Sequence, residues 1–436
     1  MKKAVPRMFL RSRLLIALLA PMVCHAGLDP VEQRIAAAVN HNHARYVALL
    51  EETVNIPSAT ENLAGVRAVG QVYAKELKQL GFQTHWIEMP AEMNRAGHLA
   101  ATLARGEGPR ILLIGHLDTV LENEAYERSG NLAYGSGASD MKGGNAIIIA
   151  ALRALQDAQV PKRGPVTVVF TGDEENPGEP VDAARRALRD AASESDIALA
   201  FEGAVPGVAV IGRRGIAMWQ LRVEGRQGHS SRIFREEKGH GAIFEATRIL
   251  WRFHEELPEA NLTFNPSLIV GGTDVTLDYA SKHGTAAGKT NVIPRDVRAE
   301  GDLRFLSAEQ YASARERMTR IVSENLPVTS AQLSIAEEYP AMAPTDRNRE
   351  LLSLLSEVSL DLGHGPIAAQ DPAERGAGDI SFVCDGRLAC LDGLGAMGEN
   401  AHAPREYVEL DSLAMLTQRT AILLYRLWRS SGSVNQ

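Results

Sequence analysis

Two short apolar runs place the strongest constraint on how this chain of 436 residues can fold. They extend from Arg110 to Gly115 and from Pro165 to Phe170, and each is bounded by glycine or proline. Such runs are typical of strands that are buried on both faces of a sheet. Between them, the alanine- and isoleucine-rich segment 144–155 predicts a helix long enough to cross from one parallel strand to the next. The pattern therefore predicts an α/β layer architecture.

The pattern changes after about Gly215. Alternating segments at 216–223, 297–305 and 332–335 predict strands, and segments 241–255 and 308–325 predict helices. We expect a small α+β insert over residues 216–337, built as an open-faced sheet with two helices. The larger domain would then be discontinuous, comprising residues 27–215 and 338–436, and helical spacing between Val31 and Gly81 predicts that it opens with helices.

The first 26 residues are typical of an export signal. Five basic side chains precede an apolar run from Leu14 to Val23, and Ala26 follows as a small residue suited to cleavage. The run is too short to span a bilayer. Cys24 leaves lipoprotein processing as a poorer alternative. We expect cleavage after Ala26 and a periplasmic or secreted protein.

Removal of this segment changes the formal charge from -8 to -13, because the segment carries five basic and no acidic side chains. Such a surface should repel nucleic acid and anionic membranes, so we expect neither as a partner. No long hydrophobic run follows residue 27, which argues against stable membrane insertion. Cys384 and Cys390 would remain, either paired in an oxidising compartment or as two free thiols.

Side chains that bind metals recur where the predicted strands end. His116 and Asp118 follow the first strand two residues apart, so an extended chain points both to one side. Such an imidazole with a neighbouring carboxylate is a standard metal pairing, although a strand-end histidine is often structural. Asp140 precedes the crossover helix, where it could equally be a helix cap.

Further candidates follow the second strand. Glu174 and Glu175 are neighbours whose side chains must diverge, so one could bind a metal while the other reaches a water; a solvated acidic loop is the alternative. Converging carboxylates would raise one another's pKa, a cost that divalent cations remove. With Glu202 and His402, the set would give each of two zinc ions three protein ligands around one shared aspartate.

Five motifs, taken in order, resemble those of the M20 metallopeptidases, and most closely the glutamate carboxypeptidase branch. They are His-Leu-Asp-Thr-Val, Gly-Ser-Gly-Ala-Ser-Asp-Met-Lys-Gly-Gly, Thr-Gly-Asp-Glu-Glu, Phe-Glu-Gly and Gly-Glu-Asn-Ala-His. The similarity runs from about residue 40 to residue 428. It implies a three-layer zinc-binding α/β domain with an inserted α+β lid of the ferredoxin-like kind, which often mediates dimerisation. We therefore expect a homodimer through the lid.

The same resemblance implies two zinc ions per subunit, for which Co²⁺ or Mn²⁺ would substitute. The ligands that it implies are Asp140 as the bridge, His116 and Glu202 for one site, and Glu175 and His402 for the other. Glu174 would be the general base, and Asp118 would orient His116 and tune the metal.

Other implied residues recognise the substrate. His229 would polarise the scissile carbonyl, commonly across the dimer interface, although alone it resembles a surface-loop histidine. Asn291 and Arg304 match lid positions that hold the substrate's carboxylate, and an ordinary strand-surface arginine is the alternative for Arg304. The chain departs from the pattern at 375–381, where relatives have a glycine-rich run with Thr-Asp. Either Arg375 supplies a carboxylate contact there or the specificity differs.

These features predict an exported di-zinc hydrolase that cleaves the amide bond of a small peptide or N-acylated amino acid and releases a C-terminal amino acid. Glu174 would take a proton from the attacking water and pass it to the leaving amine, while His229 would help to stabilise the oxyanion. An aminoacylase or related deacylase is the main alternative. A periplasmic binding protein that has lost catalysis is a distant one.

Overall fold

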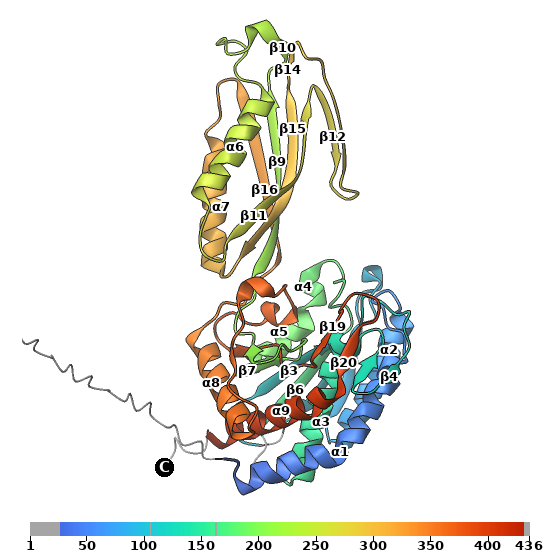
Figure 1. The fold of residues 1–436 in the computed structure, drawn as a ribbon. Coiled ribbons are helices and arrows are strands. Elements are labelled where there is room, and N and C mark those ends of the chain that lie inside the picture. Colours follow the sequence, from blue (N-terminus) through green and yellow to red (C-terminus); the bar gives the residue numbers. More distant parts are fainter. Residues whose placement is uncertain (1–26, 105, 162–163, 431–436) are drawn as a thin grey trace, which may run out of the picture.

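The computed structural model describes residues 27–104, 106–161 and 164–430, so the predicted export signal lies outside the described residues. The described residues form a larger α/β domain and a smaller α+β lid that stands on it (Figure 1). The lid sheet begins at Gly215 and its last strand ends at Tyr339, next to the expected boundaries of the insert.

The main sheet of the larger domain has six strands. Their order across the sheet is β1 (Gln83–Ile87), β2 (His98–Leu103), β6 (Val166–Thr171), β3 (Ile111–His116), β7 (Ile197–Ala200) and β18 (Ala389–Leu391). β6, β3, β7 and β18 are parallel, whereas β2 runs antiparallel to both of its neighbours, β1 and β6. Helix α3 (Gly143–Asp157) connects β3 to β6, as the two apolar runs predict.

Both faces of this sheet are covered, which gives three layers. Ile111 and Leu113 of β3 belong to the core that packs on α1, α3 and α9, whereas Leu112 and Ile114 belong to a second core on the opposite face. Besides α3, the described α-helices of the larger domain are α1 (Pro30–Val54), α2 (Leu63–Gln79), α4 (Val181–Ala184), α5 (Arg186–Ser193), α8 (Asp346–Asp361) and α9 (Leu410–Ser430). A strand buried on both faces must be apolar throughout, which explains the sequence of β3.

Helix α1 shows how local sequence sets an element boundary. Asp29 precedes the helix, and its carboxylate accepts hydrogen bonds from the amides of Val31 and Glu32, both at 2.8 Å. The Glu32 carboxylate accepts a hydrogen bond from the Asp29 amide at 2.9 Å. With Pro30 in the first turn, this reciprocal cap satisfies amides that the helix itself cannot pair.

A small antiparallel sheet brings two distant loops together. It contains β19 (Gly398–Glu399), β20 (Tyr407–Glu409), β5 (Leu132–Tyr134) and β4 (Glu127–Ser129), in that order. The pairing of β20 with β5 places the loop at 400–406 beside the loop that leads into the short helical turn η2 (Ala138–Lys142). A further pair joins β8 (Val208–Ala209) to β17 (Ala368–Ala369).

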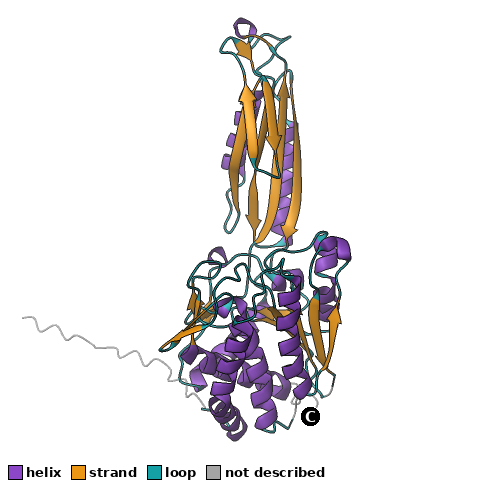
Figure 2. Cartoon of the chain, turned by 90° about the vertical axis from the view of Figure 1, so that its right-hand side faces the viewer, coloured by secondary structure: helices purple, strands orange, loops and turns teal. Residues whose placement is uncertain are grey.

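The lid has a ferredoxin-like topology. Its antiparallel sheet has the order β11 (Thr263–Gly272), β15 (Asp296–Phe305), β9 (Gly215–Gly225) and β16 (Thr329–Tyr339), with α6 (Ala242–Glu256) and α7 (Ala308–Ser323) on one face (Figure 2). Alternate residues of β9, including Trp219 and Leu221, are buried beneath these helices. Strand β11 and a hairpin of β12 (Asp274–Asp278) and β13 (His283–Ala287) were not predicted from the sequence.

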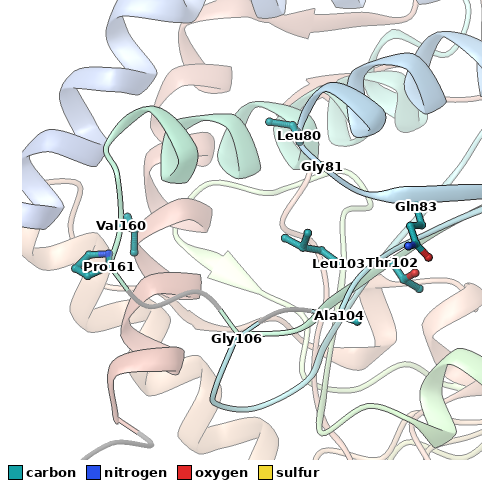
Figure 3. A pocket seen from close by; sticks show the side chains of 9 residues that line it. All are labelled: Leu80, Gly81, Gln83, Thr102, Leu103, Ala104, Gly106, Val160 and Pro161. Carbon is teal, nitrogen blue, oxygen red and sulfur yellow. The ribbon is translucent and has the colours of Figure 1, made fainter.

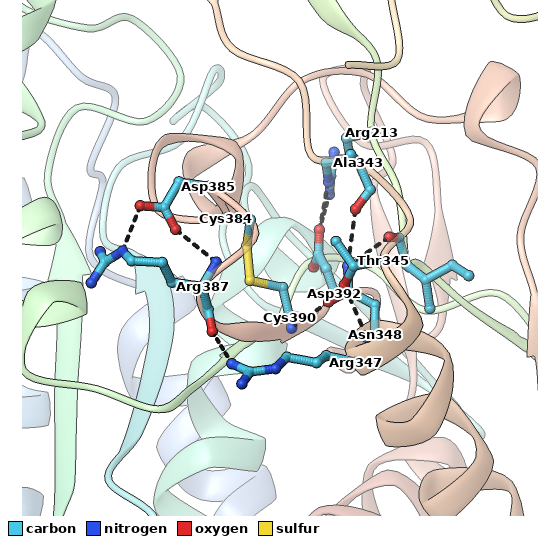
Figure 4. The surroundings of a disulfide bond; sticks show 11 residues. Arg213, Ala343, Thr345, Arg347, Asn348, Cys384, Asp385, Arg387, Cys390 and Asp392 are labelled. Atoms are coloured by element: carbon cyan, nitrogen blue, oxygen red, sulfur yellow. Dashed lines mark hydrogen bonds and ion pairs between the residues drawn. A yellow bond between two sulfur atoms is a disulfide. The ribbon is translucent and has the colours of Figure 1, made fainter. Parts of the chain in front are cut away.

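Cys384 and Cys390 form a disulfide (Figure 4), which decides between the two alternatives left open by the sequence. The bond closes a short loop that leads into β18. The Cys390 amide donates a hydrogen bond to Asn348 at 2.8 Å, and Asp392, two residues later, forms an ion pair with Arg213. Within the described ranges, no helix is both long and apolar enough to cross a membrane.

Candidate metal centre and active site

His116, the last residue of β3, presents one ring nitrogen to a cluster of carboxylates. Its side chain is 1% exposed. The Nδ1 atom lies 2.9 Å from the backbone oxygen of Asp118, and because a carbonyl oxygen only accepts, Nδ1 carries the proton. The other nitrogen, Nε2, faces Asp140 Oδ1 at 3.1 Å and Glu202 Oε1 at 3.9 Å. A metal ion would therefore be bound through Nε2.

A second group forms on the other side of Asp140. Nε2 of His402 lies 3.0 Å from Asp140 Oδ2 and 3.0 Å from Glu175 Oε2. Within each group, His116–Asp140–Glu202 and Asp140–Glu175–His402, the possible ligand atoms all lie within 4.8 Å of one another. The structure thus brings together all five predicted ligands in two triads that share Asp140.

The carboxylates of the cluster are in an electrostatically unfavourable position without cations. Burial and the charge of Asp140 raise the pKa of Glu202 to about 8. Burial raises the pKa of Glu175, and burial together with Glu202 raises the pKa of Glu174 well above its ordinary value. Burial also opposes ionisation of Asp140. Without metal, the raised pKa values of His116 and His402 keep both rings fully protonated, and their hydrogen bonds lower the pKa of Asp140. Two divalent cations would relieve this repulsion.

The donor set fits divalent metal ions. It consists of two imidazoles and three carboxylates, the ligand types that zinc accepts. In addition, Oε1 of Glu175 is buried and has no hydrogen-bond partner among the described residues, so it has unused capacity to bind a cation. Three protein ligands for each ion leave a coordination position for water or substrate, as in catalytic sites.

Asp118 supports the cluster in more ways than the sequence indicates. Nδ1 of His116 is 3.5 Å from its carboxylate and closer to its backbone oxygen. The carboxylate accepts hydrogen bonds from the amides of Glu174 and Glu175, both at 3.1 Å, and from Thr60 Oγ1 at 2.7 Å. Asp118 therefore fixes the backbone of the two glutamates as well as the imidazole.

Glu406 is a second supporting residue, which sequence reasoning missed. Its carboxylate accepts hydrogen bonds from the amides of Gly137 at 2.7 Å, Ser139 at 2.8 Å and Asp140 at 2.9 Å. It lies four residues after His402, so it ties the loop of one ligand to the loop of the shared ligand. No periodicity marks this position, and only the pairing of β20 with β5 reveals its partners.

The cluster forms one wall of a cavity of about 330 Å³. Its lining also includes Glu174, Arg213 and Arg375. Arg213 forms a buried ion pair with Asp392, and its Nη1 donates to the Gly376 oxygen at 2.8 Å. The Arg375 guanidinium donates to the Gly203 oxygen at 2.9 Å, and no carboxylate of the described residues lies within ion-pair distance of it. The cavity therefore combines metal ligands with a cation that has no partner of opposite charge in the described part of the chain.

The predicted lid residues lie outside this cavity. His229 belongs to β10 (Gly228–His229), which pairs with β14 (Val292–Ile293) at the end of the lid farthest from the larger domain (Figure 1). The backbone oxygen of Asn291 accepts a hydrogen bond from Ser230 at 2.9 Å, so Asn291 lies at the same end. Arg304 lies at the other end of the sheet opposite Ile216, and its Nε is 2.8 Å from Asp302 Oδ2.

Another hollow of the larger domain lacks this chemistry (Figure 3). Its described lining comprises Leu80, Gly81, Gln83, Thr102, Leu103, Ala104, Gly106, Val160 and Pro161. None of these side chains is acidic, basic or a metal ligand. The metal-binding chemistry of the described residues is therefore concentrated at the carboxyl ends of the parallel strands, where open α/β sheets bind ligands.

Comparison with known proteins agrees with this geometry. The model of peptidase family M20/M25/M40 matches residues 112–426. The chain belongs to this family. It is 26% identical to carboxypeptidase G2 of Pseudomonas sp. (strain RS-16) over 391 residues, which cover 87% of this chain and 89% of that protein. This M20 chain is also 29% identical to a succinyl-diaminopimelate desuccinylase of Gluconobacter oxydans over 393 residues, which cover 85% and 94% of the two chains.

A solved structure shows the same fold. The chain superimposes on the Bacillus subtilis YXEP protein, described as a dinuclear metal-binding peptidase of the M20 family, with a TM-score of 0.61 and 16% identity. The alignment covers 89% of this chain and 99% of that one. The fold class and the family predicted from the sequence are confirmed, and the chain is an M20 metallohydrolase.

Proposed function

We propose that this protein is a di-zinc hydrolase that cleaves the amide bond between an acyl group and an amino acid whose carboxylate is free. One observation carries the proposal: four ligands of the two triads, a further glutamate and an arginine without an acidic partner among the described residues line the same cavity. The metal ligands and the further glutamate supply hydrolytic chemistry, and the arginine favours an anionic substrate.

The chain's own residues divide the work as follows. His116, Asp140 and Glu202 would hold one ion, and Asp140, Glu175 and His402 the other. Bound zinc would polarise the scissile carbonyl and lower the pKa of water toward neutrality. Glu174 is adjacent to a ligand but belongs to neither triad, so it is placed to accept a proton from the attacking water. Once protonated, Glu174 would pass that proton to the leaving amine.

Arg375 is the strongest candidate for recognition of the substrate's carboxylate. Its guanidinium lies in the cavity wall and donates to the oxygen of Gly203, the residue after the ligand Glu202. Because a guanidinium binds a carboxylate through two parallel hydrogen bonds, Arg375 would fix the distance between that carboxylate and the scissile bond. The departure from the family pattern at 375–381 then marks this chain's own specificity.

Two branches of the family remain as candidate activities. Carboxypeptidase-type cleavage would release a C-terminal amino acid, as the sequence predicts. The desuccinylase relatives favour the alternative, in which a small acyl group is removed from an amino acid. Both substrates share an N-acylated amino acid unit, and the acyl groups differ. We infer the shared unit as the substrate class and let experiment decide the acyl group.

We also propose that the active enzyme is a homodimer through the lid. His229 and Asn291 lie too far along the lid to line the cavity of their own chain, so a partner's lid would supply them. The outer side of α6 carries exposed apolar side chains, Ile243, Phe244 and Trp251, and Ile269 of the edge strand β11 is exposed as well. Apolar exposure of this kind favours burial against a second copy.

Export is the third part of the proposal. The disulfide between Cys384 and Cys390 supports it, because disulfides persist in oxidising compartments such as the periplasm. The basic and apolar segment that precedes residue 27 supports it independently.

The function is tested by release of free amino acid from purified protein that begins at residue 27. The panel should contain peptides with C-terminal glutamate and the corresponding N-acetyl and N-succinyl amino acids, each with zinc and with chelator. We expect zinc-dependent release, with substrates that carry a free α-carboxylate strongly preferred over their amides. Equal rates for acid and amide forms would contradict carboxylate recognition, and release that persists in chelator would contradict the metal mechanism.

A further inference from the structure

A buried arginine lies between two aspartates behind the metal cluster. Arg185 is 0% exposed. Its Nη1 is 2.7 Å from Asp173 Oδ1, and its Nε is 2.6 Å from Asp379 Oδ1. All three side chains are buried, so their charges have little contact with water. A charged group in such a position is costly unless it is paired. The guanidinium is hydrogen-bonded to Asp173, and its contact with Asp379 is an ion pair without hydrogen-bond geometry.

The first aspartate belongs to the loop that carries the proposed base and a metal ligand. Asp173 immediately precedes Glu174 and Glu175. Its second carboxylate oxygen accepts a hydrogen bond from the Gly178 amide at 3.0 Å, and its backbone oxygen accepts one from Arg185 Nη2 at 3.0 Å. Arg185 therefore holds both the side chain and the backbone of this loop, in addition to the two amides that Asp118 fixes.

The second aspartate belongs to the segment that borders the cavity. Asp379 lies four residues after Arg375, and residues 374–377 line the cavity. Asp379 accepts a hydrogen bond from Thr171 Oγ1 at 2.5 Å. Thr171 is the last residue of β6, next to the base loop. The pocket segment is thus anchored to the same strand end from which the base loop begins.

We propose that Arg185 is a positioning residue that couples the base loop at 173–178 to the pocket segment at 375–379. The effect of this coupling on catalysis rests on the proposed function, whereas the contacts that link the two segments do not depend on it. A displacement of either segment changes the position of the guanidinium, and the other segment must follow. Substrate recognition by Arg375 and metal binding by Glu175 then depend on each other, although the two residues lie 200 positions apart in the chain.

The test uses cobalt titration of metal-free protein, followed by the visible absorption of the bound ion. The variants are Arg185→Lys, Asp379→Asn and the double variant. Asp379→Asn keeps the shape of the side chain and an acceptor for Thr171 but removes the charge that Arg185 pairs with. Arg189→Lys is the matched control: Arg189 lies one turn later on α5 over the same Phe382 ring, but it is exposed and pairs with Asp182.

We expect each single variant to weaken binding of one of the two cobalt ions about tenfold, as loss of supporting contacts around metal ligands commonly does. The double variant should bind cobalt no more weakly than the single variant with the lower affinity, because both substitutions break the same Arg185–Asp379 ion pair. The Arg189→Lys variant should bind both cobalt ions with the affinity of the unchanged protein. With substrate, Asp379→Asn should also lower kcat at saturating metal, an effect that a merely local role in the pocket segment would not produce.

Two results would overturn the coupling. One is unchanged cobalt affinity in a folded Asp379→Asn variant, which decides the question even where Arg185→Lys does not fold. The other is a double variant whose fold-reduction in cobalt affinity equals the product of the fold-reductions in the two single variants. Cobalt binding is measured without substrate. If the unchanged protein failed to hydrolyse the substrate panel, the proposed function would be contradicted, but the cobalt affinities of the variants would still test the coupling.

Discussion

The larger domain holds its predicted metal ligands in two triads, each with its possible ligand atoms within 4.8 Å of one another, whereas the lid holds His229 and Asn291 at the end farthest from that domain. The ligands sit on a buried strand end and on loops fixed by Asp118 and Glu406. His229 lies on β10, which pairs over two residues with β14, and Asn291 immediately precedes β14. The candidate metal ligands therefore come together within one chain, whereas His229 and Asn291 would reach the proposed active site only through a partner subunit or a large movement.

The largest expected effect is that of Glu174→Gln. This change removes the proposed base and keeps the shape of the side chain, so we expect kcat to fall by roughly 10²–10⁴-fold. Metal content should stay unchanged because Glu174 belongs to neither triad. Steady-state kinetics together with elemental analysis check this. A near-normal kcat would show that another group takes the proton.

His229→Ala tests the lid half of the comparison. Loss of an oxyanion-stabilising group should lower kcat by about 10²-fold or more, with metal binding intact. His283→Ala, which changes an exposed histidine of β13, is the control. If His229 acts in a partner's site, mixing the Glu174→Gln and His229→Ala proteins should restore about a quarter of normal activity, since half the dimers gain one complete site. No restoration on mixing would place His229 in its own chain's site.

A smaller effect concerns the pH dependence of metal binding in the larger domain. Hydrogen bonds to Asp140 and Glu175 raise the pKa of His402 to about 10, and burial raises that of Glu202 to about 8. Both groups therefore hold protons at pH 7 without metal, and a metal ion must displace them. Affinity should rise as pH increases from 6 to 9, by up to about tenfold per pH unit for each displaced proton. Calorimetry in buffers of different ionisation enthalpy measures the released protons; binding without proton release would contradict these pKa values.

The smallest effect on activity is expected from Cys384→Ser with Cys390→Ser. The disulfide closes a loop with a sequence separation of 6 residues, so its loss should cost about 2 kcal/mol of unfolding free energy. The loss should appear in the melting of the larger domain and leave that of the lid unchanged. Differential scanning calorimetry separates the two transitions. A kcat that falls more than a few-fold would show that this loop also supports the active site.

The sequence predicts the parts of the molecule that depend on local pattern. Strands β3 and β6, the crossover helix α3 and strand β9 follow from continuous or alternating burial, which a single chain displays directly. The hairpin of β12 and β13 was missed because its residues are polar, small and largely exposed, so no apolar alternation marks it.

In the site, too, residues in local motifs were predicted, whereas residues that depend on distant partners were not. His116, Asp140 and Glu175 stand in recognisable motifs, and the structure brings them together. Glu406 and Arg185 could not be found, because Glu406 binds amides more than 260 residues away in the chain and Arg185 pairs with Asp379, which is more than 190 residues away. Likewise, two cysteines predict either a disulfide or two thiols until the distance between them is known. The roles of the lid residues stay predictions until an assembled dimer is tested.

The most direct test of the account is the number of zinc ions bound per chain, measured by native mass spectrometry of the protein that begins at residue 27. We expect two ions for the unchanged chain and loss of both in Asp140→Ala, since Asp140 is common to both triads. Binding of a single ion by the unchanged chain, or retention of two ions by Asp140→Ala, would contradict the shared-aspartate centre.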